Sequence, residues 1–261
     1  MSFFHKFKNL KIHYTDQGSG KAIVLLHGFL EDLSMWNIIV PELSKKNRVI
    51  CIDLLGHGKT DSIGYVHKME DMAEAINSVL KHLKLRKYIL IGHSMGGYVA
   101  LAFAKLHTES IKGLCLLNST YEADDNERKQ LRIRANKMVQ TNYENMVRMS
   151  FANLFSAESK LKQTEAYNTA LQIALKTPLQ GYMAANEGMM QRLDYSTFFA
   201  KATFKKMVLL GQKDTILNSE NILKFTKMHS IETHVFSEGH MSHIENSKAF
   251  ITKTMRFVEK T

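Results

Sequence analysis

Cysteine is scarce in this sequence, and no apolar stretch is long enough to span a membrane. The 261 residues include two cysteines, Cys51 and Cys115, each inside a short apolar run. Such thiols are expected to be free and buried in strands, because unpaired cysteines behave as small apolar side chains. No group of cysteine and histidine residues has the spacing of a metal site, so no metal is expected.

Targeting segments and linkers are also missing. No apolar run approaches the ~18 residues of a membrane-spanning helix, and the segment from Met1 to Lys6 lacks the apolar core of a signal peptide. These absences predict a cytoplasmic protein with no membrane span. No proline- or glycine-rich linker divides the chain, which holds only two prolines. One main core is therefore expected.

Positive charge is in excess, but it is not concentrated on one element. The net charge is +10, yet lysine and arginine are spread along the chain. The densest stretch, from Arg128 to Lys137, follows an acidic segment and is predicted to be the solvated face of a helix. Without a recognition motif this charge does not indicate nucleic-acid binding, whereas a basic rim that attracts anionic substrates is the better alternative. Neither a Walker loop nor a strand-linked Gly-x-Gly-x-x-Gly is present, so no cofactor is expected.

Apolar runs of strand length alternate with helical segments along most of the chain. Continuous apolar strands are typical of a mostly parallel sheet covered by helices on both faces. The pattern therefore predicts an α/β fold with a doubly wound sheet. A hairpin is expected at 3–16, strands at 22–26, 48–53, 88–91, 111–117, 206–210 and 233–236, and helices at 36–43, 69–83, 98–106, 222–228 and from 247.

The alternation stops between Ser119 and about Lys205. This stretch is helical, rich in methionine and aromatic residues, and lacks any convincing strand. Most of these side chains are expected to hold the segment together, with a few facing a site. We therefore predict a helical cap at 119–205, inserted in a core formed by 1–118 and 206–261.

The segment Gly92-His93-Ser94-Met95-Gly96 connects a predicted strand to a predicted helix. A Gly-x-Ser-x-Gly pattern is weak by itself, but this context matches a sharp turn that exposes a nucleophilic serine. Side chains at Gly92 and Gly96 would collide with neighbouring backbone in so tight a turn. The following helix offers unpaired amides and the positive end of its dipole, which suit an oxyanion.

A serine hydroxyl needs a histidine base to act as a nucleophile near neutral pH. His240 directly follows the predicted strand 233–236 and is the preferred candidate, because short connections position catalytic groups best. His243, three residues later, is the rival.

The base in turn needs a carboxylate to orient it. Asp214 directly follows the predicted strand 206–210. Glu122 and Asp124 are alternatives near the end of the strand after the nucleophile helix, but they are expected on the exposed first turn of the cap. Asp53 is expected to brace the turn at Gly56-His57-Gly58.

Five motifs appear in one order along the chain: His27-Gly28-Phe29, Asp53-Leu54-Leu55-Gly56-His57-Gly58, Gly92-His93-Ser94-Met95-Gly96-Gly97, Gly211-Gln212-Lys213-Asp214 and Gly239-His240. Together they resemble the capped α/β-hydrolase family over residues 10–260. The resemblance implies a catalytic triad of Ser94, Asp214 and His240, and an oxyanion hole formed by the backbone amides of Phe29 and Met95.

The resemblance also implies supporting roles around the nucleophile. Gly92, His93, Gly96 and Gly97 would shape the nucleophile turn, and His27 and Gly28 would brace the oxyanion loop. A serine nucleophile argues against epoxide hydrolase and haloalkane dehalogenase, which use a carboxylate in this fold.

The activity expected from these residues is that of a serine hydrolase acting on a small carboxylic ester, because the cap is short and its candidate lining is apolar. A carbon–carbon bond hydrolase or lyase and a perhydrolase are alternatives on the same triad. A ligand receptor with little turnover is the alternative outside enzymes, since fold alone does not determine function. Oligomeric state is not addressed by any of these patterns.

Overall fold

The computed structural model describes residues 1–261. Its eight strands form one sheet: β1 (Ser2–Phe7), β2 (Leu10–Gln17), β3 (Lys21–Leu26), β4 (Asn47–Ile52), β5 (Tyr88–His93), β6 (Ile111–Leu117), β7 (Lys205–Gly211) and β8 (Glu232–Phe236). The strand order is β1-β2-β4-β3-β5-β6-β7-β8. The β1–β2 and β2–β4 pairs are antiparallel, and every later pair is parallel. The expected mostly parallel sheet is confirmed.

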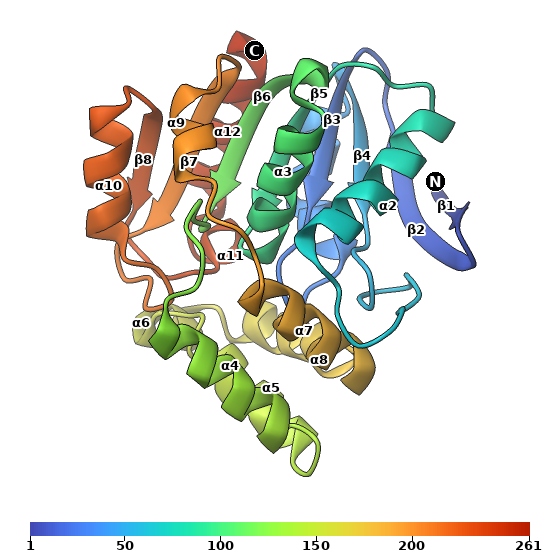
Figure 1. Ribbon diagram of the computed structural model, residues 1–261. Helices are drawn as coiled ribbons and strands as arrows, with labels where there is room; N and C mark the ends of the chain where they lie inside the picture. Colours follow the sequence, from blue (N-terminus) through green and yellow to red (C-terminus); the bar gives the residue numbers. More distant parts are fainter.

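Helices cover both faces of the sheet, as Figure 1 shows. One face packs against α2 (Met69–His82), α3 (Met95–Leu106), α9 (Ser196–Lys201) and α10 (Ser219–Met228). The other face packs against the 3-10 helix η1 (Leu33–Ile38), α1 (Val40–Leu43) and α12 (Ser247–Lys260), where Trp36 and Phe250 are fully buried. The two short elements η2 (Thr108–Ser110) and α11 (Ser242–Glu245) complete the core. The sheet is therefore doubly wound, because each face has its own apolar layer.

The central strands are buried along their whole length, which explains their continuous apolar sequences. Every residue of β5 is buried, and so is every residue of β3 after Lys21. Both cysteines are buried free thiols inside β4 and β6, as predicted. No helix of the protein is both long and apolar enough to cross a membrane.

Between β6 and β7 the chain forms a separate helical layer, beyond the arrowheads of the strands in Figure 1. It consists of α4 (Asn126–Met138), α5 (Tyr143–Ala152), α6 (Ala157–Lys162), α7 (Thr164–Leu175) and α8 (Leu179–Met190). Phe151 and Val147 lie in its own apolar cluster, which also includes Leu30 from the core. This layer covers the edge of the sheet where the parallel strands end.

The last helix of the interstrand segment does not belong to that layer. Phe199 of α9 is fully buried in the apolar cluster between the sheet and the helices α2 and α3. The helical layer over the strand ends therefore stops near α8, before the expected boundary at Lys205, because the aromatic residues of α9 pack on the sheet instead.

Candidate active site

Ser94 occupies a sharp turn between β5 and α3. Its backbone has φ +49° and ψ −116°, in a region that residues with a side chain rarely adopt. A Cβ atom at Gly92 would lie 2.3 Å from the carbonyl oxygen of Gly96, and one at Gly96 would lie 2.3 Å from the carbonyl oxygen of Leu26. Glycine at both positions is what allows the turn, since any side chain would strike backbone.

The structure brings Ser94, His240 and Asp214 into one line of hydrogen bonds. His240 Nε2 lies 2.9 Å from Ser94 Oγ, and His240 Nδ1 lies 2.7 Å from Asp214 Oδ2. The three residues follow β5, β8 and β7, so the sheet delivers them to one edge. This geometry requires the Nδ1–H of His240 to donate to the carboxylate, which leaves Nε2 free to accept the serine proton.

The Asp214 carboxylate is buried and ionised. Burial alone would raise its pKa, but His240 and the hydrogen bonds from Asn118 and Ile216 hold the pKa below the ordinary value. Asn118 Nδ2 donates to Asp214 Oδ2 at 3.1 Å, and the Ile216 amide donates to Oδ1 at 2.8 Å. Asn118 was not predicted as a site residue. Its position at the end of β6, beside β7, was the available signal.

The alternative base and acids lie elsewhere. His243 is buried with its Nε2 3.6 Å from Glu31 Oε1, and no hydrogen bond joins it to Ser94. Asp124 forms ion pairs with Arg132 and Arg192. The geometry therefore favours His240 and Asp214 over these alternatives.

The amides of Phe29 and Met95 have no acceptor in the protein. Met95 is the first residue of α3, where a backbone N–H lacks an intrahelical partner. The Phe29 amide likewise donates to no backbone carbonyl. Two such unpaired donors beside Ser94 would suit a developing oxyanion.

His27 and Gly97 hold the loops around the serine. His27 Nδ1 donates to the Gly28 carbonyl at 2.7 Å, and its Nε2 accepts from the Leu54 amide at 2.9 Å. A Cβ at Gly97 would lie 2.2 Å from Ser119 Oγ, the hydroxyl that donates to the carbonyl of Ser94. These contacts fix the backbone on both sides of the nucleophile turn.

Asp53 braces its own loop, as expected. It accepts hydrogen bonds from the amides of Leu33 and Lys59 and contacts His13 Nδ1 at 2.6 Å. A Cβ at Gly58 would lie 2.2 Å from the Asp53 carboxylate, so glycine is required there.

Glu31 is a buried acid that the sequence patterns did not reveal. Its Oε2 accepts from the Gly28 amide at 2.6 Å and from His93 Nδ1 at 2.7 Å. His93 Nε2 in turn donates to the carbonyl of His240 at 3.0 Å. Glu31 and His93 thereby connect three segments: the loop at Gly28, the turn that holds Ser94, and the loop that holds His240.

The protonation states around Glu31 follow from these contacts. Burial would raise the pKa of Glu31, but His93 beside it lowers the pKa to about 2. Burial would lower the pKa of His93, but Glu31 raises it above the ordinary value. Burial lowers the pKa of His243 to about 3, so that ring is neutral. The Glu31–His93 contact is therefore an ion pair beside a neutral imidazole.

These three side chains also form the one grouping with the donor types of a metal site. One donor atom from each of Glu31, His93 and His243 lies within 4.8 Å of the others. They come from segments far apart in the sequence, which is why spacing could not reveal them. The shortest contact within the group is the Glu31–His93 hydrogen bond, so the ion pair accounts for the grouping.

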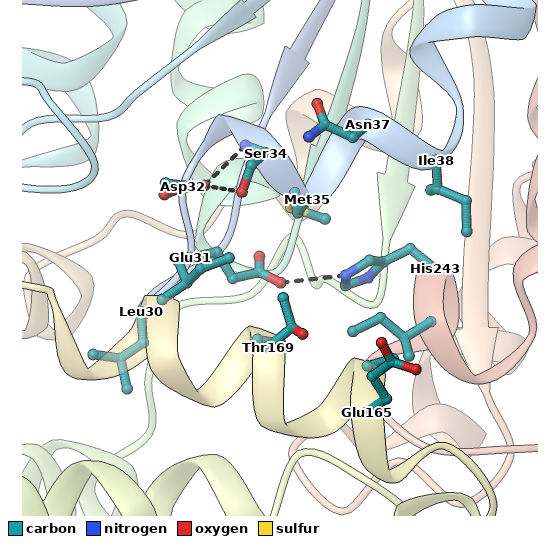
Figure 2. Close-up of a pocket in the computed structure, with 14 residues that line it drawn as sticks. Leu30, Glu31, Asp32, Ser34, Met35, Asn37, Ile38, Glu165, Thr169 and His243 are labelled. Carbon is teal, nitrogen blue, oxygen red and sulfur yellow. Dashed lines mark hydrogen bonds and ion pairs between the residues drawn. The ribbon is translucent and has the colours of Figure 1, made fainter.

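Two cavities lie on either side of Leu30 and Glu31. The one that contains Ser94 has a volume of about 360 Å³. The other, about 480 Å³, lies between η1 and α7 and does not reach Ser94. Figure 2 shows Glu31 and His243 between the η1 residues and the α7 residues Thr169 and Glu165. The smaller cavity is the candidate substrate site because it contains Ser94 and His240.

The lining of the smaller cavity is mainly apolar, with Phe29 and Tyr182 among its residues, but it also includes two arginines. Arg128 and Arg132 face it, although the sequence pattern placed that stretch on a solvated helix face. Of the methionines between β6 and β7, Met189 lines the cavity, whereas the aromatic residues Phe151 and Phe155 pack in the interior of the helical layer. The expectation was wrong for the arginines, because α4 turns one charged side toward the nucleophile.

A mostly parallel sheet that presents a serine, a histidine and an aspartate at the ends of its strands is the architecture of a class of hydrolases. The chain belongs to the α/β-hydrolase fold family: the family model described as alpha/beta hydrolase fold matches residues 21–247. The resemblance inferred from the five motifs is thereby confirmed.

The relatives of this chain differ from one another in activity. A thermophilic esterase from Thermogutta terrifontis, solved with malate bound, is 28% identical and superposes with a TM-score of 0.92, covering 100% of this chain and 98% of that one. A 2-hydroxy-6-oxononadienedioate/2-hydroxy-6-oxononatrienedioate hydrolase from Burkholderia vietnamiensis is 26% identical over 96% of this chain and 92% of its own length. The dihydrolipoyllysine-residue acetyltransferase component of an acetoin cleaving system from Pseudomonas putida is 28% identical over 92% of this chain, which spans 64% of that protein.

Proposed function

We propose that the protein is a serine hydrolase that cleaves small carboxylic esters through an acyl-enzyme on Ser94. The observation that carries the proposal is the unbroken line of hydrogen bonds from Asp214 through His240 to Ser94 Oγ. The 28% identical esterase, which this chain matches over its whole length, supports the choice of an ester substrate.

The first half of the proposed reaction forms the acyl-enzyme. His240 Nε2 takes the proton of Ser94 as its Oγ attacks the ester carbonyl carbon. The amides of Phe29 and Met95 stabilise the oxyanion, a contribution worth about 3 to 4 kcal/mol for one such donor in comparable sites. The bond between the acyl carbon and the alcohol oxygen then breaks, and protonated His240 gives its proton to that oxygen, so that the alcohol leaves.

The second half releases the acid. Water gives a proton to His240 while its oxygen attacks the acyl carbon, and the bond to Ser94 Oγ breaks as the serine regains a proton. Asp214 keeps His240 in the required tautomer and stabilises its charged form throughout. We further propose that residues 119–205 contain the cap. In this proposal α4–α8 cover the site, and α9 packs against the sheet.

The Ser94→Ala variant tests the nucleophile. Ester hydrolysis of 4-nitrophenyl acetate and butyrate should fall by at least about 10⁴-fold, because removing a triad nucleophile removes nearly all turnover. A fluorophosphonate probe should label the wild-type protein and not the variant. Ser78→Ala, on α2 and hydrogen-bonded to His5, is the control that should keep activity and labelling.

Wild-type ester hydrolysis by Ser94→Ala would refute the mechanism. Absence of labelling in the wild-type protein would instead favour a ligand receptor. The main rival within enzymes is a carbon–carbon bond hydrolase, which the Burkholderia vietnamiensis relative supports. A wild-type protein that is labelled at Ser94, leaves every ester intact and cleaves ring-fission diketones would establish that rival.

A further inference from the structure

We infer that the cavity over Ser94 contains an anion subsite formed by Arg128 and Arg132, and that the enzyme prefers esters that carry a carboxylate. The inference rests on the proposed ester hydrolysis and specifies its substrate class. Both arginines line the same cavity as Ser94 and His240.

The two arginines lie on one face of α4. Residues four positions apart on a helix point to the same side, and that side faces the nucleophile here. Both side chains are half-buried, and Leu131 and Ala135 of the same helix also line the cavity. A charge in such partly apolar surroundings interacts more strongly with a ligand than one in water does.

The ion pairs of this region leave Arg128 without a partner. The buried carboxylate of Asp124 contacts two guanidinium groups, with Oδ2 on Arg132 Nε and Oδ1 2.6 Å from Arg192 Nη1. Arg128 forms no ion pair, although Asp125 and Glu122 line the neighbouring cleft with it. Asp124 therefore pairs with Arg132 and Arg192, and Arg128 has no carboxylate partner.

The remaining acid on the cavity wall does not provide this partner. Glu31 lines the cavity, but its carboxylate is paired with His93. Asp214 is bonded to His240 and does not line the cavity. An anionic group on the substrate would give Arg128 the partner that it lacks.

The guanidinium groups are already oriented and still have donors available. Arg128 Nη2 donates to the Ile216 carbonyl at 2.7 Å, which leaves its Nε and Nη1 without an acceptor. Arg132 Nη1 donates to Asn186 Oδ1 at 3.0 Å, and Asn186 Nδ2 donates back to the Arg132 carbonyl at 3.0 Å. Fixed guanidinium donors match the planar geometry of a carboxylate. The cavity volume of about 360 Å³ suits a short ester with an anionic end.

Two matched pairs of esters test the inference and locate the charge. Monoethyl glutarate against ethyl pentanoate places the carboxylate on the acyl side, and acetoxyacetate against propyl acetate places it on the alcohol side. The wild-type protein should show at least about 10-fold higher kcat/KM for the charged ester of one pair, since hydrogen bonds to charged groups are worth about 10-fold or more. The preferred pair identifies the side of the substrate that faces the arginines.

Arg128→Met should remove this preference, mainly by raising KM for the charged ester. Arg128→Lys should retain part of it. Arg134→Met is the control, because Arg134 is exposed on the same helix and changes the net charge equally. Arg128 is the better target than Arg132, whose loss would leave Asp124 with one partner, and thermal unfolding of each variant checks its fold.

The inference is wrong if the wild-type protein hydrolyses the neutral ester of both pairs as well as the charged one. It is also wrong if Arg128→Met and Arg134→Met have equal effects. Ser94-dependent hydrolysis of neutral esters would leave the proposed function intact in either case. The proposed function would be refuted by a different result, namely ester hydrolysis by the Ser94→Ala variant at the wild-type rate.

Discussion

The Glu31–His93 ion pair predicts a large, pH-dependent loss of stability in the Glu31→Gln variant. Glu31 is 5% exposed and accepts hydrogen bonds from the Gly28 amide and His93 Nδ1. Glutamine has nearly the same shape and can still accept from Gly28, so the substitution removes the charge and little else. The variant therefore isolates the electrostatic part of the contact.

The magnitude follows from the pKa of Glu31. Its pKa falls from 4.5 to about 2 on folding, a difference worth about 3 kcal/mol at roughly 1.4 kcal/mol per unit. Because the folded pKa is lowered, this stability is present above the unfolded value and is lost as pH falls toward the folded one. The raised pKa of His93 reports the same attraction from the other partner and is not added.

Urea unfolding at several pH values measures this effect. At pH 7 the free energy of unfolding of Glu31→Gln should lie about 3 kcal/mol below wild type. More than half of that difference should disappear by about pH 3, because the Glu31 carboxyl of the unfolded chain is then protonated while that of the folded protein is still largely ionised. Glu144→Gln is the control, because Glu144 forms an exposed pair with Arg148 worth under about 0.5 kcal/mol.

A difference at pH 7 no larger than that of the control would refute the reasoning. So would a difference that stays constant down to pH 3, because a packing defect does not titrate. Activity provides a second readout: weaker placement of the His240 carbonyl by His93 should lower kcat more than it changes KM.

Two further predictions concern the glycines and the cysteines. Gly96→Ala should lower the free energy of unfolding by about 3 kcal/mol or more, since its Cβ would lie 2.3 Å from the Leu26 carbonyl oxygen, and urea unfolding measures the loss. Gly64→Ala meets no atom within 4 Å and should cost only about 1 to 2 kcal/mol from its φ of +61°; equal losses would show that the close approach is unimportant. Burial raises the pKa of Cys51 to about 12 and that of Cys115 further, so a disulfide reagent should modify neither thiol until the protein unfolds. Rapid reaction of either thiol in the native protein would contradict the buried placement.

The sheet could be predicted because its signals are local. Strands such as 22–26 are apolar throughout, which is typical of a strand covered on both faces and is visible in a short window. It was harder to predict which helices between β6 and β7 form the layer over the strand ends and which pack on the sheet. The aromatic residues of α9 could pack on the cap or on the sheet, and the sequence pattern is the same for both.

The three proposed triad residues were predictable for a related reason. Each follows a strand directly, so finding the strands β5, β7 and β8 also placed Ser94, Asp214 and His240 at one edge. No local sequence pattern identifies Glu31 or Asn118 as a site residue. Their roles arise from contacts with His93 and Asp214, 62 and 96 positions away along the chain, which only the folded structure brings together.

The arginines of α4 show why the chemistry of the cavity was the least predictable part. No residue of α4 is buried, and charged side chains occur around most of its surface. Periodicity distinguishes apolar from polar faces, but it cannot distinguish a polar face in water from one that faces a cavity. That distinction depends on where α4 lies relative to Ser94, which is decided by its packing against α8 through contacts such as Arg132 with Asn186. The proposed substrate class therefore depends on the tertiary packing of the helical layer α4–α8, whereas the proposed reaction class depends on residues at the ends of the strands.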